Sequence, residues 1–247
     1  MHNQIQINAP EGIFNAYVAR PKEMPAPVIV VIHEVFGVNA DMRETCFDLA
    51  ARGYLAICPD LFWRLEPGLE MSDQTEAELA KAAALYAAFD LEAGAADIAT
   101  TIDAAHRMPG SNGRVGVVGY CLGGLLTFMT AARARPDAAV AYYPGNADRH
   151  REEADRLASP LIVHLGEEDE YIGKEAQRQI VAALWARPQA TIYRYPGCHH
   201  AFARHRGTAY DPAAAALANS RTDAFLDLHL KRVGAMNANG PVAASSR

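Results

Sequence analysis

Apolar runs of strand length alternate along this chain of 247 residues with longer segments of helical composition. Short continuous apolar runs are typical of strands that are buried on both faces. Strands that alternate with helices predict a mostly parallel central sheet with helices on both faces, which is the α/β class. Two shorter strands are expected around the turn-forming APEG within residues 4–20. The further expected strands lie in APVIVVI, YLAICPD, RVGVVG, AAVAYYP, PLIVHLG and ATIYRYP.

Helical composition marks the segments between these runs. In the first, Asn39 can cap a helix that begins near Ala40, and Gly53 can end it in the left-handed conformation. The others cover Ser72–Phe89, Asp90–Arg107, Asp148–Leu157, Lys174–Ala186 and Asp211–Arg232. We find neither an internal repeat nor a linker, so we expect one domain over residues 1–233. Residues 234–247 are small, polar and aperiodic, and we expect a disordered tail there.

Composition limits the partners and the compartment. Half of the residues are hydrophobic and the formal net charge is −6, so the chain lacks the basic surface that nucleic-acid binding requires. No apolar run is long enough to span a bilayer, and the N-terminus lacks the pattern of a signal peptide. The cysteines at 46, 58, 121 and 198 have no paired spacing. We therefore expect free thiols and a cytoplasmic protein, without nucleic-acid or membrane partners.

The sequence Gly-Tyr-Cys-Leu-Gly at residues 119–123 has the form of a nucleophile elbow. In the G-x-S-x-G version of this motif a serine lies on a sharp turn between a strand and a helix, and the glycines avoid side-chain clashes. Cys121 takes the place of the serine here. The N-terminus of the following helix would favour a thiolate and a developing oxyanion. The alternative is a buried structural cysteine at a glycine-rich strand end.

An acid and a histidine follow Cys121 in the order nucleophile, acid, histidine that is typical of the elbow's fold. Asp169 lies after the PLIVHLG run, among further acidic residues that solvent can hydrate. His199 and His200 follow the ATIYRYP run, and their spacing does not decide between them. One of them could take the thiol proton while Asp169 orients its ring. Adjacent side chains on an extended loop point apart and no further ligand cluster accompanies them, so we expect no metal.

Several segments together resemble the dienelactone hydrolases, also called carboxymethylenebutenolidases, of the α/β-hydrolase superfamily. These segments are HEVFGVNADMRET, CPDLFWR, AFDLEAG, GYCLGG, HLGEEDEYI and HHAFAR. The likeness extends from about residue 5 to the last helix, and it implies an α/β-hydrolase fold. The combination of a cysteine elbow with the E-x-x-G segment near the N-terminus makes the resemblance specific.

The resemblance implies roles for the residues after the elbow. The family's H-x-F-A-R segment matches residues 200–204, which makes His200 the catalytic histidine and His199 its neighbour. Asp169 matches the acid of the family's triad. Arg204 is implied to bind a substrate carboxylate, for which the two-pronged guanidinium group is suited.

The segment HEVFG carries further implied residues. Glu34 matches a family glutamate that keeps the resting thiol of Cys121 protonated and accepts its proton when an anionic substrate arrives. Such control is chemically reasonable because a permanent thiolate is prone to oxidation. The backbone N–H groups of Val35 and Leu122 would form the oxyanion hole.

The chain departs from the family at positions near the expected substrate. Leu79 and Ala83 occupy the places of an arginine and a tyrosine that help to hold the carboxylate, and His33 replaces a glutamine. We therefore expect a substrate that still carries a carboxylate but is bulkier and more hydrophobic than unsubstituted dienelactone. The preference for charge should be weaker.

The sequence thus predicts a thiol hydrolase that cleaves enol-lactones or small activated esters through a Cys-His-Asp triad and an acyl-thioester. Ester cleavage needs only a nucleophile, proton transfer and an oxyanion hole, so we expect no cofactor. The main alternative is a broad carboxylesterase. Two others are a catalytically silent α/β-hydrolase that binds a small ligand and a redox sensor built on Cys121 and Cys198. The expected partner is the lactone or ester, with the chain as a monomer or small homo-oligomer.

Overall fold

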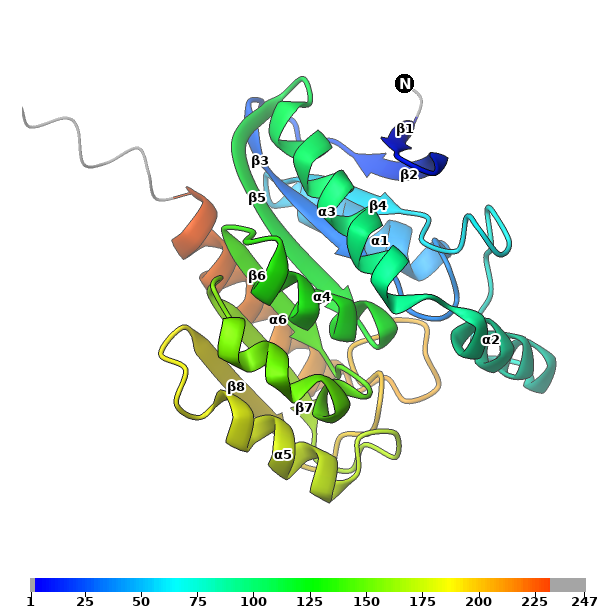
Figure 1. Ribbon diagram of the computed structural model, residues 1–247, viewed down its shortest axis with the longest axis vertical. Coiled ribbons are helices and arrows are strands. Elements are labelled where there is room, and N and C mark those ends of the chain that lie inside the picture. Colours follow the sequence, from blue (N-terminus) through cyan, green and yellow to red (C-terminus); the bar gives the residue numbers. More distant parts are fainter. Residues whose placement is uncertain (1–2, 232–247) are drawn as a thin grey trace, which may run out of the picture.

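The computed structural model describes residues 3–231 of the chain. Its strands form one eight-stranded sheet in the order β1-β2-β4-β3-β5-β6-β7-β8 (Figure 1). Their bounds are β1 Gln4–Ala9, β2 Gly12–Ala19, β3 Ala26–Ile32, β4 Leu55–Pro59, β5 Ser111–Tyr120, β6 Ala138–Tyr142, β7 Leu161–Gly166 and β8 Ala190–Tyr195. β2 is antiparallel to β1 and β4, and all other neighbours are parallel. The predicted mostly parallel sheet is confirmed.

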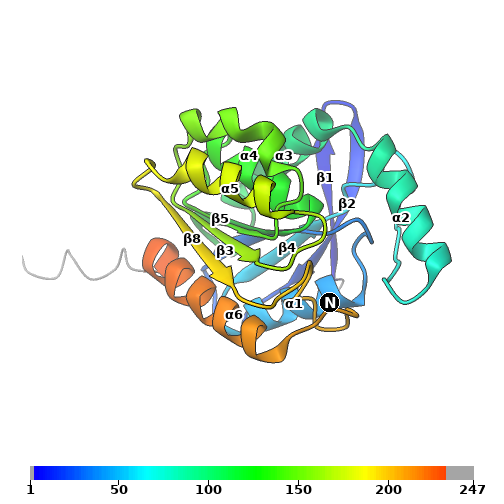
Figure 2. The same cartoon turned by 90° about the horizontal axis from the view of Figure 1, so that it is seen from below.

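Helices cover both faces of this sheet, which explains its continuous apolar strands. α3 (Leu91–Arg107), α4 (Leu122–Arg133) and α5 (Lys174–Leu184) lie on one face, and α1 (Ala40–Ala51) and α6 (Pro212–Leu226) lie on the other (Figure 2). Every residue of β3, β4, β6 and β7 is buried between these layers. α2 (Glu76–Ala88) stands apart from the layers at the periphery (Figure 1). A 3-10 segment covers Ala147–Arg156, and a π-helical segment covers Asp227–Lys231.

Two of the predicted helices differ from the structure at one end. The helix expected over Ser72–Phe89 begins only at Glu76, because the Thr75 hydroxyl accepts a hydrogen bond from the backbone N–H of Glu78 and caps the helix there. The helix expected over Asp211–Arg232 changes to π-helical geometry after α6 ends. The tail predicted at 234–247 lies outside the described residues. Between residues 3 and 231, no helix has the length and apolar character needed to cross a bilayer.

The loops after four parallel strands bring distant residues to one edge of the sheet. Parallel strands end at the same edge, where α/β proteins bind their ligands. Glu34 follows β3, Cys121 follows β5, Asp169 follows β7 and His200 lies in the loop after β8. The candidate residues of the sequence analysis therefore converge through strand topology.

Candidate active site

Cys121 lies on a sharp turn between β5 and α4. Its backbone has φ 53° and ψ −113°, which is a strained conformation for a residue other than glycine. A Cβ atom on Gly119 would lie 2.0 Å from the carbonyl oxygen of Gly123. A Cβ atom on Gly123 would lie 2.3 Å from the carbonyl oxygen of Ile32. The turn therefore requires glycine at both positions, which is the geometry of a nucleophile elbow.

Asp169 and His200 form a buried hydrogen-bonded pair. The Nδ1 atom of His200 lies 2.8 Å from Oδ2 of Asp169. The other carboxylate oxygen of Asp169 accepts hydrogen bonds from the backbone N–H groups of Tyr171 and Ile172, both at 2.8 Å. Because both oxygens are occupied, the carboxylate has a fixed orientation and holds the imidazole ring in one position.

The remaining nitrogen of His200 faces the elbow. Nε2 is buried without a hydrogen-bond partner among residues 3–231. Burial alone would lower the pKa of His200, but the negative charge of Cys121 and the contact with Asp169 outweigh it and raise that pKa to about 10. Tyr171 and Tyr143 pack against the imidazole edge to face, with ring centroids 4.9 Å and 5.0 Å away. His200 can therefore stabilise a thiolate on Cys121 as an imidazolium ion.

The neighbouring histidine has a different environment. The side chain of His199 is 63% exposed, and its Nδ1 lies 3.6 Å from Oε2 of Glu170. The side chain of His200 is only 5% exposed. The geometry thus separates two histidines that sequence spacing alone left undecided, and it brings only His200 onto Asp169.

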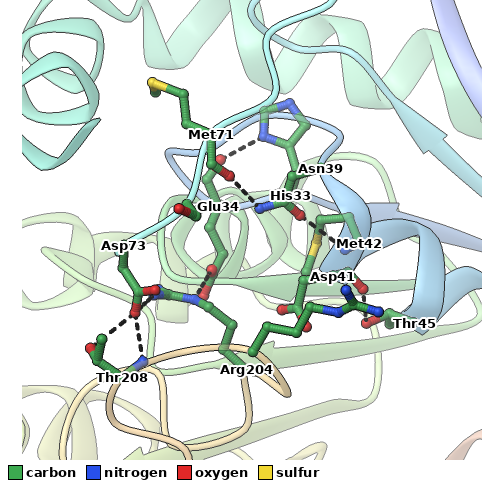
Figure 3. A network of polar contacts seen from close by, with 12 residues as sticks. His33, Glu34, Asn39, Asp41, Met42, Thr45, Met71, Asp73, Arg204 and Thr208 are labelled. Atoms are coloured by element: carbon green, nitrogen blue, oxygen red, sulfur yellow. Dashed lines mark hydrogen bonds and ion pairs between the residues drawn. The ribbon is translucent and has the colours of Figure 1, made fainter. Parts of the chain in front are cut away.

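Glu34 and Arg204 form a buried ion pair beside the elbow. The Nε of Arg204 donates to Oε2 of Glu34 over 2.5 Å, and its terminal nitrogen Nη1 donates to Oδ2 of Asp73 over 2.7 Å. Figure 3 shows Arg204 lying between these two carboxylates. Oε1 of Glu34 is buried and has no hydrogen-bond partner within the described chain. The structure places Glu34 on Arg204 rather than in a hydrogen bond with Cys121.

His33, which replaces the glutamine of the family segment, has a structural role. Its Nε2 accepts a hydrogen bond from the backbone N–H of Leu61 at 3.0 Å, so the proton of the neutral ring lies on Nδ1. Nδ1 donates to the carbonyl oxygen of Glu34 at 2.6 Å. Burial lowers the pKa of His33 and so favours this neutral form. His33 thereby anchors the backbone that carries Glu34.

A cavity of about 390 Å³ opens above Cys121. Part of its wall is apolar and is formed by Leu79, Ala82 and Ala83 of α2. Leu79 and Ala83 are the two positions at which this chain departs from the polar residues of the family. The other lining residues of the cavity include Val35, Phe36, Asp73, Tyr86, Leu122, Asn146, Tyr171, His200 and Arg204. The cavity thus joins the predicted residues to several that the sequence analysis did not single out.

Tyr86 and Asn146 are two of these additional residues. The side-chain amide of Asn146 donates to the Tyr86 hydroxyl over 2.5 Å. Burial raises the pKa of Tyr86; the hydrogen bond from Asn146 opposes this shift, and the charge of Cys121 adds to it. Asn146 has φ 63°. The only sequence signal was the position of Tyr86 on the predicted helix, three residues after Ala83.

Positive φ angles at residues other than glycine concentrate at this site. Among residues 3–231 there are five, of which Cys121, Asn146 and Ala201 line the cavity, Tyr143 packs on His200, and Arg135 lies elsewhere. Such strain persists where the surrounding structure enforces it, and it is common at functional sites.

Two residues that line the cavity have backbone N–H groups without a hydrogen-bond partner among residues 3–231. Val35 and Leu122 both line it together with Cys121. Within the described residues neither N–H group donates a hydrogen bond. Leu122 begins α4, so its N–H group belongs to the positive end of that helix. Both groups are therefore free to bind a developing oxyanion.

One group of potential metal ligands lies near the site. In residues 3–231, only Asp41, Glu44 and His205 bring their ligand atoms within 4.8 Å of one another. The carboxylate of Glu44 already accepts hydrogen bonds from two nitrogens of Arg206, at 2.9 Å and 3.0 Å. Because this guanidinium supplies the compensating positive charge, we assign no metal to the group.

All four cysteines are free. Cys46 and Cys58 are fully buried, and the thiol of Cys198 contacts Oδ2 of Asp211 at 4.0 Å. Cys198 is therefore directed toward the N-terminus of α6, which gives no support to a redox pair with Cys121.

Comparisons with known proteins agree with this architecture. The model of the dienelactone hydrolase family matches residues 14–230. A carboxymethylenebutenolidase of Pseudomonas putida is 41% identical over 223 residues, covering 90% of this chain and 94% of the relative. One from Cupriavidus pinatubonensis is 37% identical over 211 residues, covering 85% and 90%.

Solved structures show the same fold. A candidate dienelactone hydrolase of Klebsiella pneumoniae superposes with a TM-score of 0.75 at 27% identity, covering 90% of this chain and 97% of that one. A dienelactone hydrolase of Anabaena variabilis superposes with a TM-score of 0.68 at 15% identity, covering 93% and 100%. The expected α/β-hydrolase fold is confirmed, and the chain belongs to the dienelactone hydrolase family as a hydrolase of the carboxymethylenebutenolidase type.

Proposed function

We propose that the protein hydrolyses enol-lactones or small activated esters with Cys121 as nucleophile, His200 as acid and base, and Asp169 as the residue that orients His200. The observation that carries this proposal is the arrangement of Cys121, His200 and Asp169. A strained elbow presents the thiol beside an imidazole whose other nitrogen is held by a buried carboxylate. The names of the similar carboxymethylenebutenolidases support the lactone as substrate class.

The reaction proceeds in two stages in this geometry. The thiolate sulfur of Cys121 attacks the carbonyl carbon, and the carbonyl electron pair moves to the oxygen, where the N–H groups of Val35 and Leu122 stabilise it. Collapse of this intermediate breaks the bond to the leaving oxygen, which takes the proton from Nε2 of His200. The product of this stage is an acyl-thioester. His200 then removes a proton from water, which attacks the thioester and releases the acid and the thiolate.

A trapped acyl-enzyme tests this function. Wild-type protein mixed with a 4-nitrophenyl ester is expected to release a burst of nitrophenol and to gain the mass of one acyl group. Peptide mapping should find that group on Cys121, because its sulfur is the only proposed nucleophile. Two results would contradict the proposal. One is an acyl group on a residue other than Cys121, and the other is turnover, without any burst, by a protein that lacks the Cys121 thiol.

We propose that Glu34 controls the ionisation of Cys121 through its charge and its unoccupied oxygen. Oε1 of Glu34 is buried without a hydrogen-bond partner among residues 3–231, so this oxygen keeps its acceptor capacity. Glu34→Gln removes a negative charge near the thiolate, so iodoacetamide should alkylate resting Cys121 about threefold to tenfold faster at pH 7. The rise of the alkylation rate with pH should also begin at lower pH. Identical rate profiles for the two proteins would exclude the coupling.

Arg204 is proposed to contact the substrate, since this residue lines the cavity. A broad carboxylesterase would use the same residues and differs only in the range of esters it accepts. Residues 1–233 are proposed to form one domain with a tail at 234–247, and the protein is proposed to act in the cytoplasm as a monomer or small homo-oligomer. The free cysteines support a reducing compartment.

A further inference from the structure

Arg204 is the one arginine among the described residues that line the cavity, and it is already paired with two carboxylates. We propose that Asp73 occupies the position of a substrate carboxylate on Arg204, so that this enzyme selects an uncharged lactone or ester. This inference rests on the proposed function and specifies its substrate class. It differs from the carboxylate preference expected from the sequence.

Arg204 already has two carboxylate partners. Its side chain is 9% exposed, and it contacts Glu34 and Asp73, whose side chains are 2% and 8% exposed. The two carboxylates carry together one more negative charge than the guanidinium group can offset. A substrate carboxylate would be the third on the same cation, and like charges at short range repel strongly away from bulk water.

Asp73 is held in place by more than Arg204. Its Oδ2 also accepts hydrogen bonds from the backbone N–H of Thr208 at 2.8 Å and from the Thr208 hydroxyl at 3.1 Å (Figure 3). Burial would raise the pKa of Asp73, but the hydrogen bonds from Thr208 and the charge of Arg204 outweigh it and hold that pKa below its ordinary value. Asp73 therefore stays ionised at neutral pH and does not yield its place by protonation.

The rest of the cavity also suits an uncharged ligand. Its second carboxylate, Glu170, adds negative charge to the lining, and the α2 wall at Leu79 and Ala83 is apolar. The paired Tyr86 and Asn146 offer neutral polar groups instead of a cation. A lactone or ester with an apolar body and an uncharged oxygen fits this lining.

Two matched esters test the selection. Mono(4-nitrophenyl) succinate carries a free carboxylate, and its methyl ester is neutral but otherwise alike. Wild type should show a higher kcat/KM for the neutral ester. Asp73→Asn keeps an acceptor for Thr208 but removes the competing charge, so it should shift the ratio of kcat/KM values about tenfold toward the anionic ester.

The control is Glu44→Gln, which removes a carboxylate from Arg206 outside the cavity and should leave the ratio unchanged. If Asp73→Asn does not fold, Thr208→Val weakens the hold on Asp73 and should shift the ratio in the same direction by a smaller factor. A wild-type preference for the anionic ester, or an unchanged ratio in the variant that folds, overturns the role of Asp73.

These outcomes separate the inference from the function on which it rests. If the neutral ester acylates Cys121 while the ratio is insensitive to Asp73, the hydrolase function stands and only the inference fails. If neither ester acylates Cys121, both fail.

Discussion

Replacing Cys121 by alanine is expected to lower kcat/KM for a 4-nitrophenyl ester by about 10⁴-fold or more, because nucleophile, base and orienting acid act as one unit. The elbow backbone does not depend on the sulfur atom, since α4 begins at Leu122 and the required glycines remain. The melting temperature should therefore change little. Steady-state hydrolysis and a thermal melt on the same preparation measure both quantities.

Cys198→Ala is the matched control for this variant. Cys198 is a second thiol in the loop before His200, but its sulfur contacts Asp211 rather than the cavity. The variant should retain turnover close to that of wild type. If Cys121→Ala kept substantial thiol-dependent activity while Cys198→Ala lost it, the nucleophile assignment would be wrong.

The two adjacent histidines are expected to differ by orders of magnitude. His200→Ala removes the proton carrier and should reduce kcat by about 10³-fold or more. His199→Ala breaks only an exposed contact with Glu170 and should change kcat by no more than about twofold. The reverse order would show that the wrong histidine had been assigned.

Alkylation gives the His200 prediction a second readout. The pKa of His200 is raised to about 10, so the ring remains an imidazolium at pH 7 as long as Cys121 is a thiolate. Removing this positive charge disfavours the thiolate. His200→Ala should therefore slow the reaction of Cys121 with iodoacetamide at pH 7, whereas His199→Ala should leave the rate unchanged. Equal rates in all three proteins would contradict an ion pair between Cys121 and His200.

Local sequence patterns determined the frame of this protein. Continuous apolar runs such as Ala26–Ile32 became buried strands of the sheet because a strand covered on both faces needs apolar residues throughout. Gly119 and Gly123 revealed the elbow because neither position tolerates a side chain. A Cβ atom on Gly119 would collide with the backbone of Gly123, and a Cβ atom on Gly123 would collide with the backbone at the end of β3. The order of Asp169 and the histidines after Cys121 followed from the same strand-helix frame.

Tertiary structure alone decided which side chains meet inside that frame. His200 rather than His199 reaches Asp169, and the residues by themselves left that choice open until the family resemblance was considered. Arg204 is separated by 170 positions from Glu34 and by 131 from Asp73. No local pattern encodes such pairings, because they depend on how the loop after β8, the end of β3 and the segment before α2 pack together. The family resemblance therefore implied an arginine for the substrate, and only the packed chain showed that Asp73 contacts this arginine.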